Sequence, residues 1–246
     1  GTLVNGPSWT TGRIGSALSF DGVNDYVDVG SAAILDDLPA FTVSGWIYPR
    51  SVAAATDDMF GKRTVSAIGW KFGPSSTGIG RLSFNVGYGN TPLGRTSNSN
   101  VITANAWQHV VVTWDGSTSA SNSHIYINGI ETTYATNVDA IGTRSSDAAS
   151  SMSIGARTDG TQAFPGLIDD VRIYNRVLSA SEIRSLAGGI PPPPPHLPLP
   201  PPPPPPSTFP IILFGIPPEE RTVTLSVSKP IDAQSASLIM MVYDPD

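Results

Sequence analysis

The sequence predicts an all-β protein built of two packed antiparallel sheets, with one short helix at the end of the main domain. Only 14% of the 246 residues are charged, and glycine and proline number 24 each. This composition is typical of short strands joined by turns. Short runs of alternating apolar and polar residues recur along the chain, separated by turn signals such as Asp-Gly and Asn-Gly. About eight or more strands favour closure into two packed sheets.

The first strands are predicted from alternation. The stretch 17–29 (ALSFDGVNDYVDV) places Leu18 and Phe20 on one face, and a second strand follows the Asp-Gly turn. The stretch 41–48 (FTVSGWIY) alternates apolar residues with a second set of residues on the opposite face. Further strands are expected at 81–88, 107–116, 124–134, 152–156 and 167–174.

Two local sequence signals predict a turn and a helix. Asn128 and Gly129 stand between two alternating runs, and both residue types accept the positive φ of a type I′ hairpin turn. Ser179 and Glu182 have the spacing of a capping box, in which each side chain accepts a backbone N–H of the other residue. We therefore expect a hairpin at 124–134 and a short helix that starts after Ser179.

Charge and cysteine content exclude several classes of function. The formal net charge is −6 and the isoelectric point is near 4.9. These values argue against a nucleic acid or an anionic membrane surface as partner. No apolar run approaches the ~18–20 residues that a membrane span requires, so membrane insertion is not expected. The chain has no cysteine, which removes thiol nucleophiles, disulfides and Cys-ligated zinc.

A proline-rich segment at 190–208 separates the main domain, residues 1–189, from residues 209–246. Thirteen of the sixteen residues from 191 to 206 are proline. Such a segment forms a stiff polyproline II rod of about 50 Å at ~3.1 Å per residue. It suits a spacer better than a ligand for a proline-recognising domain. The last segment has strand candidates at 222–228 and 236–243, and we interpret it as the beginning of a second β-domain.

Six stretches of the main domain carry a family likeness: ALSFDGVNDYVDV, FTVSGWIYP, WQHVVVTWDG, HIYINGIE, MSIGAR and FPGLIDDVRIYNRVLSASEI. In order and spacing they resemble the laminin-G-like jelly-roll modules of the concanavalin A-like lectin/glucanase group, over about residues 1–189. The resemblance implies a two-sheet jelly-roll sandwich and an extracellular or cell-surface location. It also implies an accessory module that binds a glycan or an extracellular protein, often with a structural calcium ion.

The opening GTLVNGPSW resembles only the end of the family's usual opening. The first strand of the module is therefore expected to be missing from this sequence, which would leave an unpaired sheet edge. Alternatively, a strand from 222–243 fills that place.

Adjacent aspartates raise the question of a cation. Strand alternation places Asp169 on the same face as Val171, at the entrance of the core, where an unpaired carboxylate would be costly. Calcium takes six to eight oxygen ligands, and the turn at 21–25 offers several. The resemblance supports this pairing of an early loop with the last strand. The predicted calcium ligands are Asp21, Asn24, Asp169 and Asp170.

An ordinary explanation of the same residues stays open. Asp170 can pair with Arg172, and Asp21 can accept backbone N–H groups within its own turn. Even if calcium binds, its role would be structural: it would clamp the early and late strands together.

The main domain lacks the residues of a glycosidase. Retaining enzymes need two carboxylates about 5 Å apart, and residues 1–189 contain only two glutamates, Glu131 and Glu182. Glu182 belongs to the predicted helix cap, and neither glutamate has a second carboxylate nearby on a strand. His109 and His124 lie at unrelated strand positions, without a G-x-S-x-G elbow. We therefore expect a non-catalytic binding module.

Glycan recognition needs an aromatic face for the sugar ring and polar side chains for its hydroxyls. Candidates lie in the predicted long loops 57–70, 87–99 and 157–164. The predicted ligand-binding residues are Trp70, Tyr88, Asn90, Arg95, Arg157 and Asp159. Each of them also has an ordinary interpretation as a packed aromatic or a solvated loop residue. Protein adhesion, an architectural spacer, and targeting of a secreted polysaccharide-degrading enzyme remain alternative functions.

Overall fold

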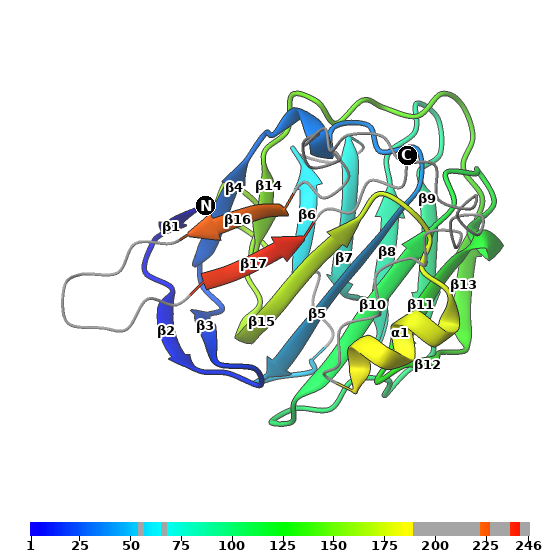
Figure 1. Ribbon diagram of the computed structural model, residues 1–246. Helices are drawn as coiled ribbons and strands as arrows, with labels where there is room; N and C mark the ends of the chain where they lie inside the picture. Colours follow the sequence, from blue (N-terminus) through cyan, green and yellow to red (C-terminus); the bar gives the residue numbers. More distant parts are fainter. Residues whose placement is uncertain (54–56, 65–67, 189–221, 227–236, 242–246) are drawn as a thin grey trace, which may run out of the picture.

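The computed structural model describes residues 1–53, 57–64, 68–188, 222–226 and 237–241. Two large antiparallel sheets face each other and one short helix lies outside them (Figure 1). The predicted all-β sandwich with one short helix is confirmed. Among the described residues, no helix has the length and apolar character needed to cross a bilayer.

The sheets differ in size. The eight-stranded sheet has the order β1 (Thr2–Val4), β4 (Tyr26–Gly30), β14 (Met152–Ile154), β6 (Phe60–Arg63), β7 (Gly69–Pro74), β8 (Leu82–Val86), β9 (Leu93–Ser97) and β13 (Tyr134–Val138). The seven-stranded sheet has the order β12 (Ile130–Glu131), β11 (Ser123–Ile127), β10 (Gln108–Trp114), β5 (Phe41–Pro49), β15 (Pro165–Tyr174), β3 (Ser16–Asp21) and β2 (Ser8–Thr11). Two 3-10 turns, η1 (Ala33–Leu35) and η2 (Ala120–Asn122), lie in connections.

The main core fills the space between the two sheets, and Phe41 of β5 lies at its centre. Its ring centroid is 5.0 Å from that of Trp70, 5.4 Å from that of Trp114 and 5.9 Å from that of Phe84. These aromatic side chains come from four strands of both sheets, and all are buried. Large aromatic rings in tilted and edge-to-face contact therefore hold the sheets together.

The hairpin and the helix form as the sequence predicts. Asn128 and Gly129 have φ values of 51° and 80°, as a type I′ turn requires. At the start of α1 (Ala180–Ala187) the Ser179 hydroxyl accepts the N–H of Glu182 at 3.3 Å. The Glu182 carboxylate accepts the N–H of Ser179 at 2.7 Å. Both halves of the predicted capping box are present.

Helix α1 covers part of the outer face of the seven-stranded sheet (Figure 1). Its buried residues, Ile183 and Leu186, lie on one side of the helix, as expected for three-residue spacing. They complete a small second core whose other members are Val111, Tyr126, Tyr174 and Leu178.

The long loops predicted at 57–70 and 87–99 are wrong: β6, the first residues of β7, and β9 lie there, and glycine interrupts the alternation of these strands. Gly61 lies in β6, Gly69 and Gly73 lie in β7, and Gly94 lies in β9. Glycine is depleted in strands and weakens the sequence signal. These strands matter because they carry the pocket described below.

The predicted face of Asp169 is wrong. The register pairs Asp169 with Trp46 and then Arg172 with Ser44, so β15 has one residue more than β5 in this interval. Asp170, in this β-bulge, has a φ of 48°. A bulge reverses the alternation, and Asp169 therefore lies on the outer face beside Trp46, while Val171 still points into the core.

On the outer face, Asp169 binds the tight turn between β2 and β3. Its Oδ2 atom accepts the N–H of Ile14 at 2.8 Å. A Cβ at Gly12 would lie 2.5 Å from this same oxygen, so the close approach requires glycine at position 12. The carboxylate thus fastens an edge hairpin to the central strand β15.

Beyond the sandwich, β16 (Thr222–Ser226) and β17 (Ser237–Met241) pair antiparallel with each other. Among the described residues they form a two-stranded sheet of their own. The predicted linker 190–208 lies outside the described residues. That a first strand is missing, that a strand from 222–243 fills its place, and that a second β-domain follows all stay predictions.

Candidate functional site

A pocket of about 140 Å³ lies where β6, β7 and β8 meet the segment before β9. Its lining residues are Arg63, Ile68, Gly69, Trp70, Lys71, Asn85, Val86, Gly87 and Pro92. We call it the β6–β8 pocket. Pockets that enclose a drug-sized ligand measure roughly 300–1,000 Å³. The β6–β8 pocket is therefore large enough only for one unit or one substituent of a larger ligand.

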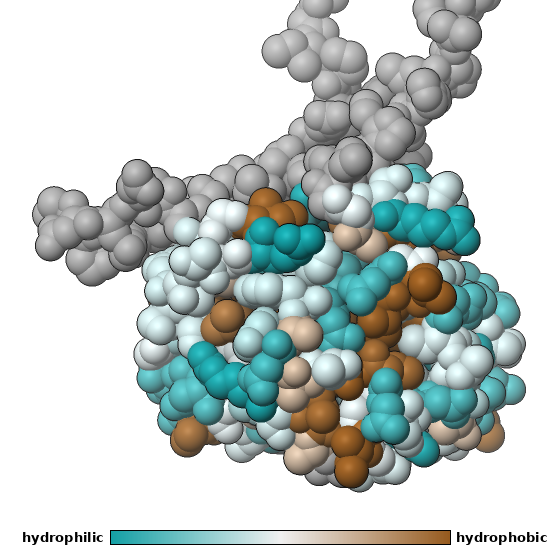
Figure 2. Space-filling model, turned by 90° about the horizontal axis from the view of Figure 1, so that it is seen from below, coloured by the Kyte–Doolittle hydropathy of each residue, from teal (hydrophilic) through white to brown (hydrophobic). Residues whose placement is uncertain are grey.

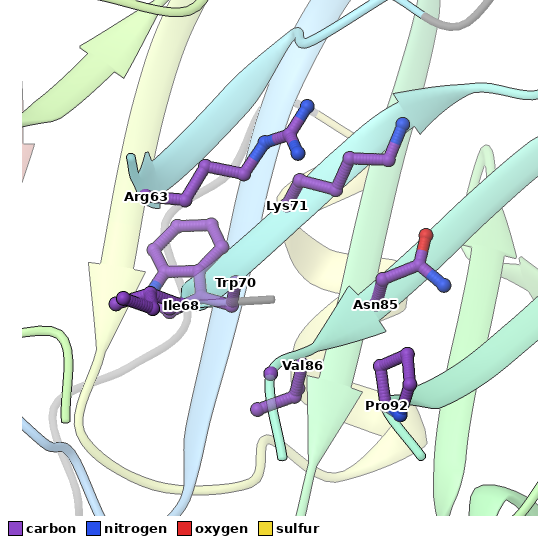
Figure 3. Close-up of a pocket in the computed structure, with 9 residues that line it drawn as sticks. Arg63, Ile68, Trp70, Lys71, Asn85, Val86 and Pro92 are labelled. Carbon is purple, nitrogen blue, oxygen red and sulfur yellow. The ribbon is translucent and has the colours of Figure 1, made fainter. Parts of the chain in front are cut away.

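Strand alternation places three polar side chains on one face of this sheet. In β7, Trp70 and Phe72 point into the core, so Lys71 between them points outward. Lys71 pairs with Asn85 of β8 across the ladder. Figure 3 shows the side chains of Arg63, Lys71 and Asn85 extending in the same direction from neighbouring strands.

Glycines flank Lys71 and Asn85 in the sheet. The register continues from Lys71 to Gly61 on β6, and from Asn85 to Gly94 on β9. Both glycines and Lys71 are nevertheless buried, while Asn85 is partly exposed. Asp58 Oδ2 lies 3.6 Å from the position that a Cβ at Gly61 would take, so the segment before β6 covers this part of the outer face.

Behind the pocket wall, a buried carboxylate holds the two cations. Arg63 donates Nε to Asp58 Oδ2 at 2.7 Å and Nη2 to Asp58 Oδ1 at 3.0 Å. This two-pronged geometry fixes the guanidinium plane. Arg63 also donates to the side-chain oxygen of Gln162. Asp58 does not line the pocket, whereas Arg63 does.

Lys71 has a different environment. Its Nζ atom lies 3.6 Å from Asp58 Oδ1, which is too long for a hydrogen bond. The atom is buried and has no hydrogen-bond partner among the residues that the structure describes. Burial lowers the pKa of Lys71, and the Arg63 charge acts in the same direction, while Asp58 opposes both.

Asp57, next to this group, has an altered pKa. Burial raises the pKa of Asp57 to about 6; the Lys71 ammonium acts in the opposite direction and Asp58 reinforces the rise. Asp57 does not line the pocket. Its charge can nevertheless change between pH 5 and pH 7, and it acts on Lys71.

Of the six predicted ligand-binding residues, only Trp70 lines the pocket. Its side chain belongs to the core and is 2% exposed, so its ring does not present a free stacking face. Tyr88 is also part of the core. For both aromatic residues the structure agrees with the ordinary interpretation as packing residues.

The other four predicted residues lie at separate places. Arg95 is buried, lies over the ring of Tyr134 with 3.5 Å between guanidinium carbon and ring centroid, and donates to the carbonyl of Ala120. Arg157 and Asp159 form an ion pair with each other in an exposed loop. Asn90 is exposed. The structure does not bring these residues together into one site.

The four predicted calcium ligands fall into two groups. The register pairs Asp21 with Pro165, which is four residues before Asp169 on β15, or roughly 13 Å along the strand. Asp170 forms an ion pair with Arg172 at 3.0 Å. One calcium site built from both groups does not fit this geometry. Among the described residues, no group of three or more His, Cys, Asp or Glu side chains could hold a metal ion.

The turn at 21–25 is held by its own hydrogen bonds. Asp21 Oδ1 accepts the N–H of Val23 at 2.7 Å, and Asp25 Oδ2 accepts the N–H of Asp21 at 3.0 Å. The Asn24 carbonyl accepts from the Asn5 side chain. Burial raises the pKa of Asp25, while its backbone hydrogen bond to Asp21 acts in the opposite direction.

Sequence reasoning missed Arg63, Lys71 and Asn85. One signal was available: the stretch GWKFGP alternates Trp70, Lys71 and Phe72, which is the pattern of a strand with a lone cation on its outer face. No comparable signal marks Arg63 or Asn85, because their meeting depends on the strand register.

Comparisons with known proteins place the fold. No curated protein matches the sequence. Among solved structures, domain 4 of AbnA, an extracellular arabinanase from Geobacillus stearothermophilus in complex with arabinotriose, matches with 22% identity and a TM-score of 0.50. The match covers 76% of this chain and 82% of that chain. The CBM40 of a Ruminococcus gnavus IT-sialidase, bound to α2,3-sialyllactose, matches with 14% identity and a TM-score of 0.54 over 70% of this chain and 96% of that chain.

A third similar structure is the binding domain of Paraclostridial Mosquitocidal Protein 1. It matches with 16% identity and a TM-score of 0.54, covering 76% of this chain and 47% of that chain. At these identities the structural matches show a shared fold. The sequence itself matches the laminin-G family described as the concanavalin A-like lectin/glucanases superfamily over residues 21–184, which is more than half of the chain. The chain therefore belongs to this family, as the resemblance of its strand motifs predicts.

Proposed function

We propose that this protein is a non-catalytic, extracellular carbohydrate-binding module whose β6–β8 pocket receives one unit of a glycan. The observation that carries the proposal is the convergence of Arg63, Lys71 and Asn85 from three adjacent strands on a pocket of about 140 Å³. Polar side chains on a rigid sheet suit the recognition of sugar substituents. Two structures with the same fold, an arabinanase domain and a sialidase module, were solved with saccharides bound.

Neither glutamate in the described residues is suited to act as the catalytic acid of a glycosidase. Hydrogen bonds from His124 and Tyr134 lower the pKa of Glu131 despite its partial burial. The Arg176 guanidinium and the helix cap lower the pKa of Glu182 to about 2. A catalytic acid needs a raised pKa. Hydrolysis of a polysaccharide by this chain alone would contradict the proposal.

The surface offers weaker support for a protein partner. The exposed large hydrophobic side chains come from separate parts of the fold: Ile14, Val23, Ile68, Ile79, Ile130, Val138, Ile141 and Val177. Figure 2 shows one face of the molecule, on which apolar residues form a narrow, irregular band among polar ones. A broad apolar patch of several hundred Å² would favour protein docking.

A glycan array followed by calorimetry tests the proposal. We expect a defined saccharide specificity that an Asn85→Ala and Arg63→Met double variant reduces by at least about tenfold, the loss of one charge-assisted hydrogen bond. An array without any bound saccharide, combined with capture of a purified extracellular protein, would favour adhesion instead. If the module instead targets a polysaccharide-degrading enzyme, the third possibility, it should bind the substrate of that enzyme.

We also propose calcium binding, confined to the turn at 21–25. The carboxyl groups of Asp21 and Asp25 interact with each other there, beside the backbone carbonyl oxygen of Asn24, and oxygen ligands suit calcium. Asp169 and Asp170 take no part in this smaller site. Thermal melting in calcium and in chelator tests it: a bound ion raises the midpoint by mass action, and an unchanged midpoint at millimolar calcium would exclude the site.

A further inference from the structure

The outer face of the seven-stranded sheet carries a group of buried polar side chains. Strand alternation places Ser44 and Trp46 of β5 on this face, because the residues on either side of them point into the core. The register pairs His109 of β10 with Trp46, and Arg172 of β15 with Ser44. Each of the four side chains belongs to a residue that is at most 8% exposed. We call this group the outer polar row.

Each member of the outer polar row has an atom without a hydrogen-bond partner among the described residues: Trp46 Nε1, Arg172 Nη1, His109 Nδ1 and Ser44 Oγ. The indole and guanidinium nitrogens can only donate. Arg172 uses its other groups on Asp170, with Nε donating to Oδ1 at 3.0 Å and Nη2 lying 3.0 Å from Oδ2. Since buried donors are nearly always paired, the row requires oxygen acceptors from a layer above it.

The outer face of an antiparallel sheet is exposed to water unless another layer of the chain covers it. Helix α1 covers the neighbouring part of this face, around Val111 and Tyr126. Over the ring of Trp46 lies the guanidinium of Arg13, 4.9 Å from the ring centroid. Arg13 is itself a donor and accepts no hydrogen bond. It therefore leaves the need of the outer polar row for acceptors unmet.

Aromatic rings continue the outer polar row along β5. Tyr48 lies two residues after Trp46, on the same face. Its ring centroid is 5.7 Å from that of Trp107, in an edge-to-face contact, and both residues are half-buried. Surfaces lined with aromatic rings are the ones that bind proline-rich segments in the polyproline II conformation.

The chain contains a segment with the complementary chemistry. Thirteen of the sixteen residues from 191 to 206 are proline, and proline has no N–H. A polyproline II helix makes no internal hydrogen bonds, so its carbonyl oxygens are free to accept. The segment thus offers apolar rings and acceptors with few donors, whereas the outer polar row offers aromatic rings and donors without acceptors.

The described chain ends beside this face before the proline-rich segment begins. A Cβ at Gly129 would lie 3.3 Å from the Cβ of Ala187, so α1 ends at the turn between β11 and β12. Asn128 in this turn is bound to His109 of the outer polar row. Its Oδ1 accepts the His109 N–H at 2.9 Å, and its own N–H donates to the His109 carbonyl at 2.8 Å.

The next described part of the chain also lies at this sheet. Strand β17 contacts β15 (Figure 1). The strand order β11-β10-β5-β15 places about 14 Å between the end of α1 and β15, at ~4.8 Å per strand. About five residues of polyproline II span this distance at ~3.1 Å per residue. The proline-rich segment is therefore long enough to cross the outer polar row.

We infer that residues 191–206 of this chain pack along the outer face of the seven-stranded sheet, where their carbonyl oxygens accept the N–H groups of Trp46 and Arg172. The segment then belongs to the module as a covering layer and does not project from it as a free rod. This contact goes beyond the proposed glycan binding, because the β6–β8 pocket belongs to the other sheet.

Paramagnetic labelling of the full chain tests the placement. The chain has no cysteine, so a nitroxide on a His196→Cys variant is its single label. Docking holds position 196 over β5 and β10. We therefore expect the label to broaden the amide NMR signals of these two strands more strongly than those of β7 and β8, which lie one sheet further away.

Hydrogen exchange of the indole N–H groups tests the predicted hydrogen bond. A variant in which glycine and serine replace the prolines of 191–206 keeps the length of the segment. It should speed the exchange of the Trp46 indole N–H at least about fivefold, the value of one hydrogen bond. The indole of Trp9, which packs against the main core, is the control in the same spectrum. Trp46→Phe and Trp9→Phe identify the two signals.

Several results would overturn the inference. Equal broadening of both sheets, no broadening, or an unchanged exchange rate of the Trp46 indole would show that the segment does not cover the outer polar row. Broadening of β5 and β10 in a mixture of nitroxide-labelled and nitrogen-15-labelled chains would assign the face to a second copy. If a saccharide shifts these amide signals while the label broadens neither strand, the face is a glycan site instead.

Discussion

Lys62 is a cation inside the sandwich, and its environment explains why it is tolerated. Its Nζ atom lies 2.9 Å from Asp36 Oδ1 and 3.5 Å from Asp147 Oδ1. It also donates to the carbonyls of Asp147 and Ser150 at 2.6 Å and 2.8 Å. Four oxygens from two loops thus surround one ammonium on β6. Buried charges are tolerated where they are paired and hydrogen-bonded in this way.

Replacing Lys62 with methionine should therefore be strongly destabilising. The Asp147 carboxylate is fully buried and, among the residues that the structure describes, would keep Arg144 as its remaining charged partner. Breaking a buried pair by removing one partner costs about 3–5 kcal/mol. Urea unfolding of Lys62→Met measures this loss, with Arg184→Met as the exposed control. A change below about 1 kcal/mol would show that the network contributes no more than a surface pair.

For Asp57 we predict the opposite effect on stability: its replacement should stabilise the folded state. Because burial raises its pKa in the folded state to about 6, ionisation above that pH is unfavourable for folding. The folded state binds more protons than the unfolded state between about pH 4 and pH 6, so this group's contribution to stability falls as pH rises through that window. Asp57→Asn, which stays neutral, should melt at a higher temperature than the unaltered chain at pH 7.5.

The pH dependence of the melting temperature shows whether the Asp57 charge causes the stabilisation. The advantage of Asp57→Asn should shrink as the pH is lowered toward 4, where the natural carboxyl is also neutral. Asp159→Asn, in an exposed loop, serves as the comparison at each pH. An advantage of Asp57→Asn that is constant from pH 7.5 to pH 4 would mean that charge is not its cause.

At the scale of elements, the bulge in β15 decides what the aspartates do. It turns Asp169 to the outer face, where the carboxylate accepts the N–H of Ile14 at 2.8 Å. Burial raises the pKa of Asp169, and this hydrogen bond acts in the opposite direction. The residue holds the β2–β3 hairpin, an edge element, against the central strand.

Asp169→Ala should loosen that hairpin. Loss of the acceptor leaves a partly buried N–H unpaired and costs about 1–3 kcal/mol. Hydrogen exchange should show faster exchange of the amides of β2 and β3 than of those in β10. Asp159→Ala, which breaks an exposed ion pair, should change stability by less than about 1 kcal/mol. Unchanged protection in β2 and β3 would contradict the fastening role.

At the scale of the whole molecule, His109 makes the free energy of unfolding depend on pH in the acidic range. It is 1% exposed and lies beside Trp46, with ring centroids 5.2 Å apart. Burial lowers the pKa of His109 to about 3, and the Arg172 charge acts in the same direction. Between about pH 6.5 and pH 3 the unfolded chain binds the proton and the folded chain does not. Stability is therefore lost as pH falls through this range.

His109→Phe tests this acid sensitivity. Phenylalanine keeps a ring against Trp46 and cannot titrate, so the variant should lose less stability than the unaltered chain between pH 6.5 and pH 4. Urea midpoints at both pH values give the comparison. His124→Phe, at a more exposed position, is the control. Equal losses in His109→Phe and the unaltered chain would assign the acid sensitivity to other groups.

The sequence predicted local structure correctly wherever neighbouring residues determine it. The Asn128–Gly129 turn depends on two residues that accept positive φ, and the helix cap depends on Ser179 and Glu182, three positions apart. The strand at 41–48 was found within one residue of its bounds because its alternation is uninterrupted. The family motifs added the two-sheet arrangement, which the sheets confirm.

The sequence by itself therefore determined the all-β class, the family and the local turns, since each follows from patterns within a few residues. The tertiary structure alone decided which polar groups meet. Lys62 and Asp147 are 85 residues apart in the sequence, and Lys71 meets Asn85 only through the register of β7 and β8. One extra residue in β15 reversed the face of Asp169. Strand register and bulges are set by the packing of the whole sandwich, which local alternation does not encode.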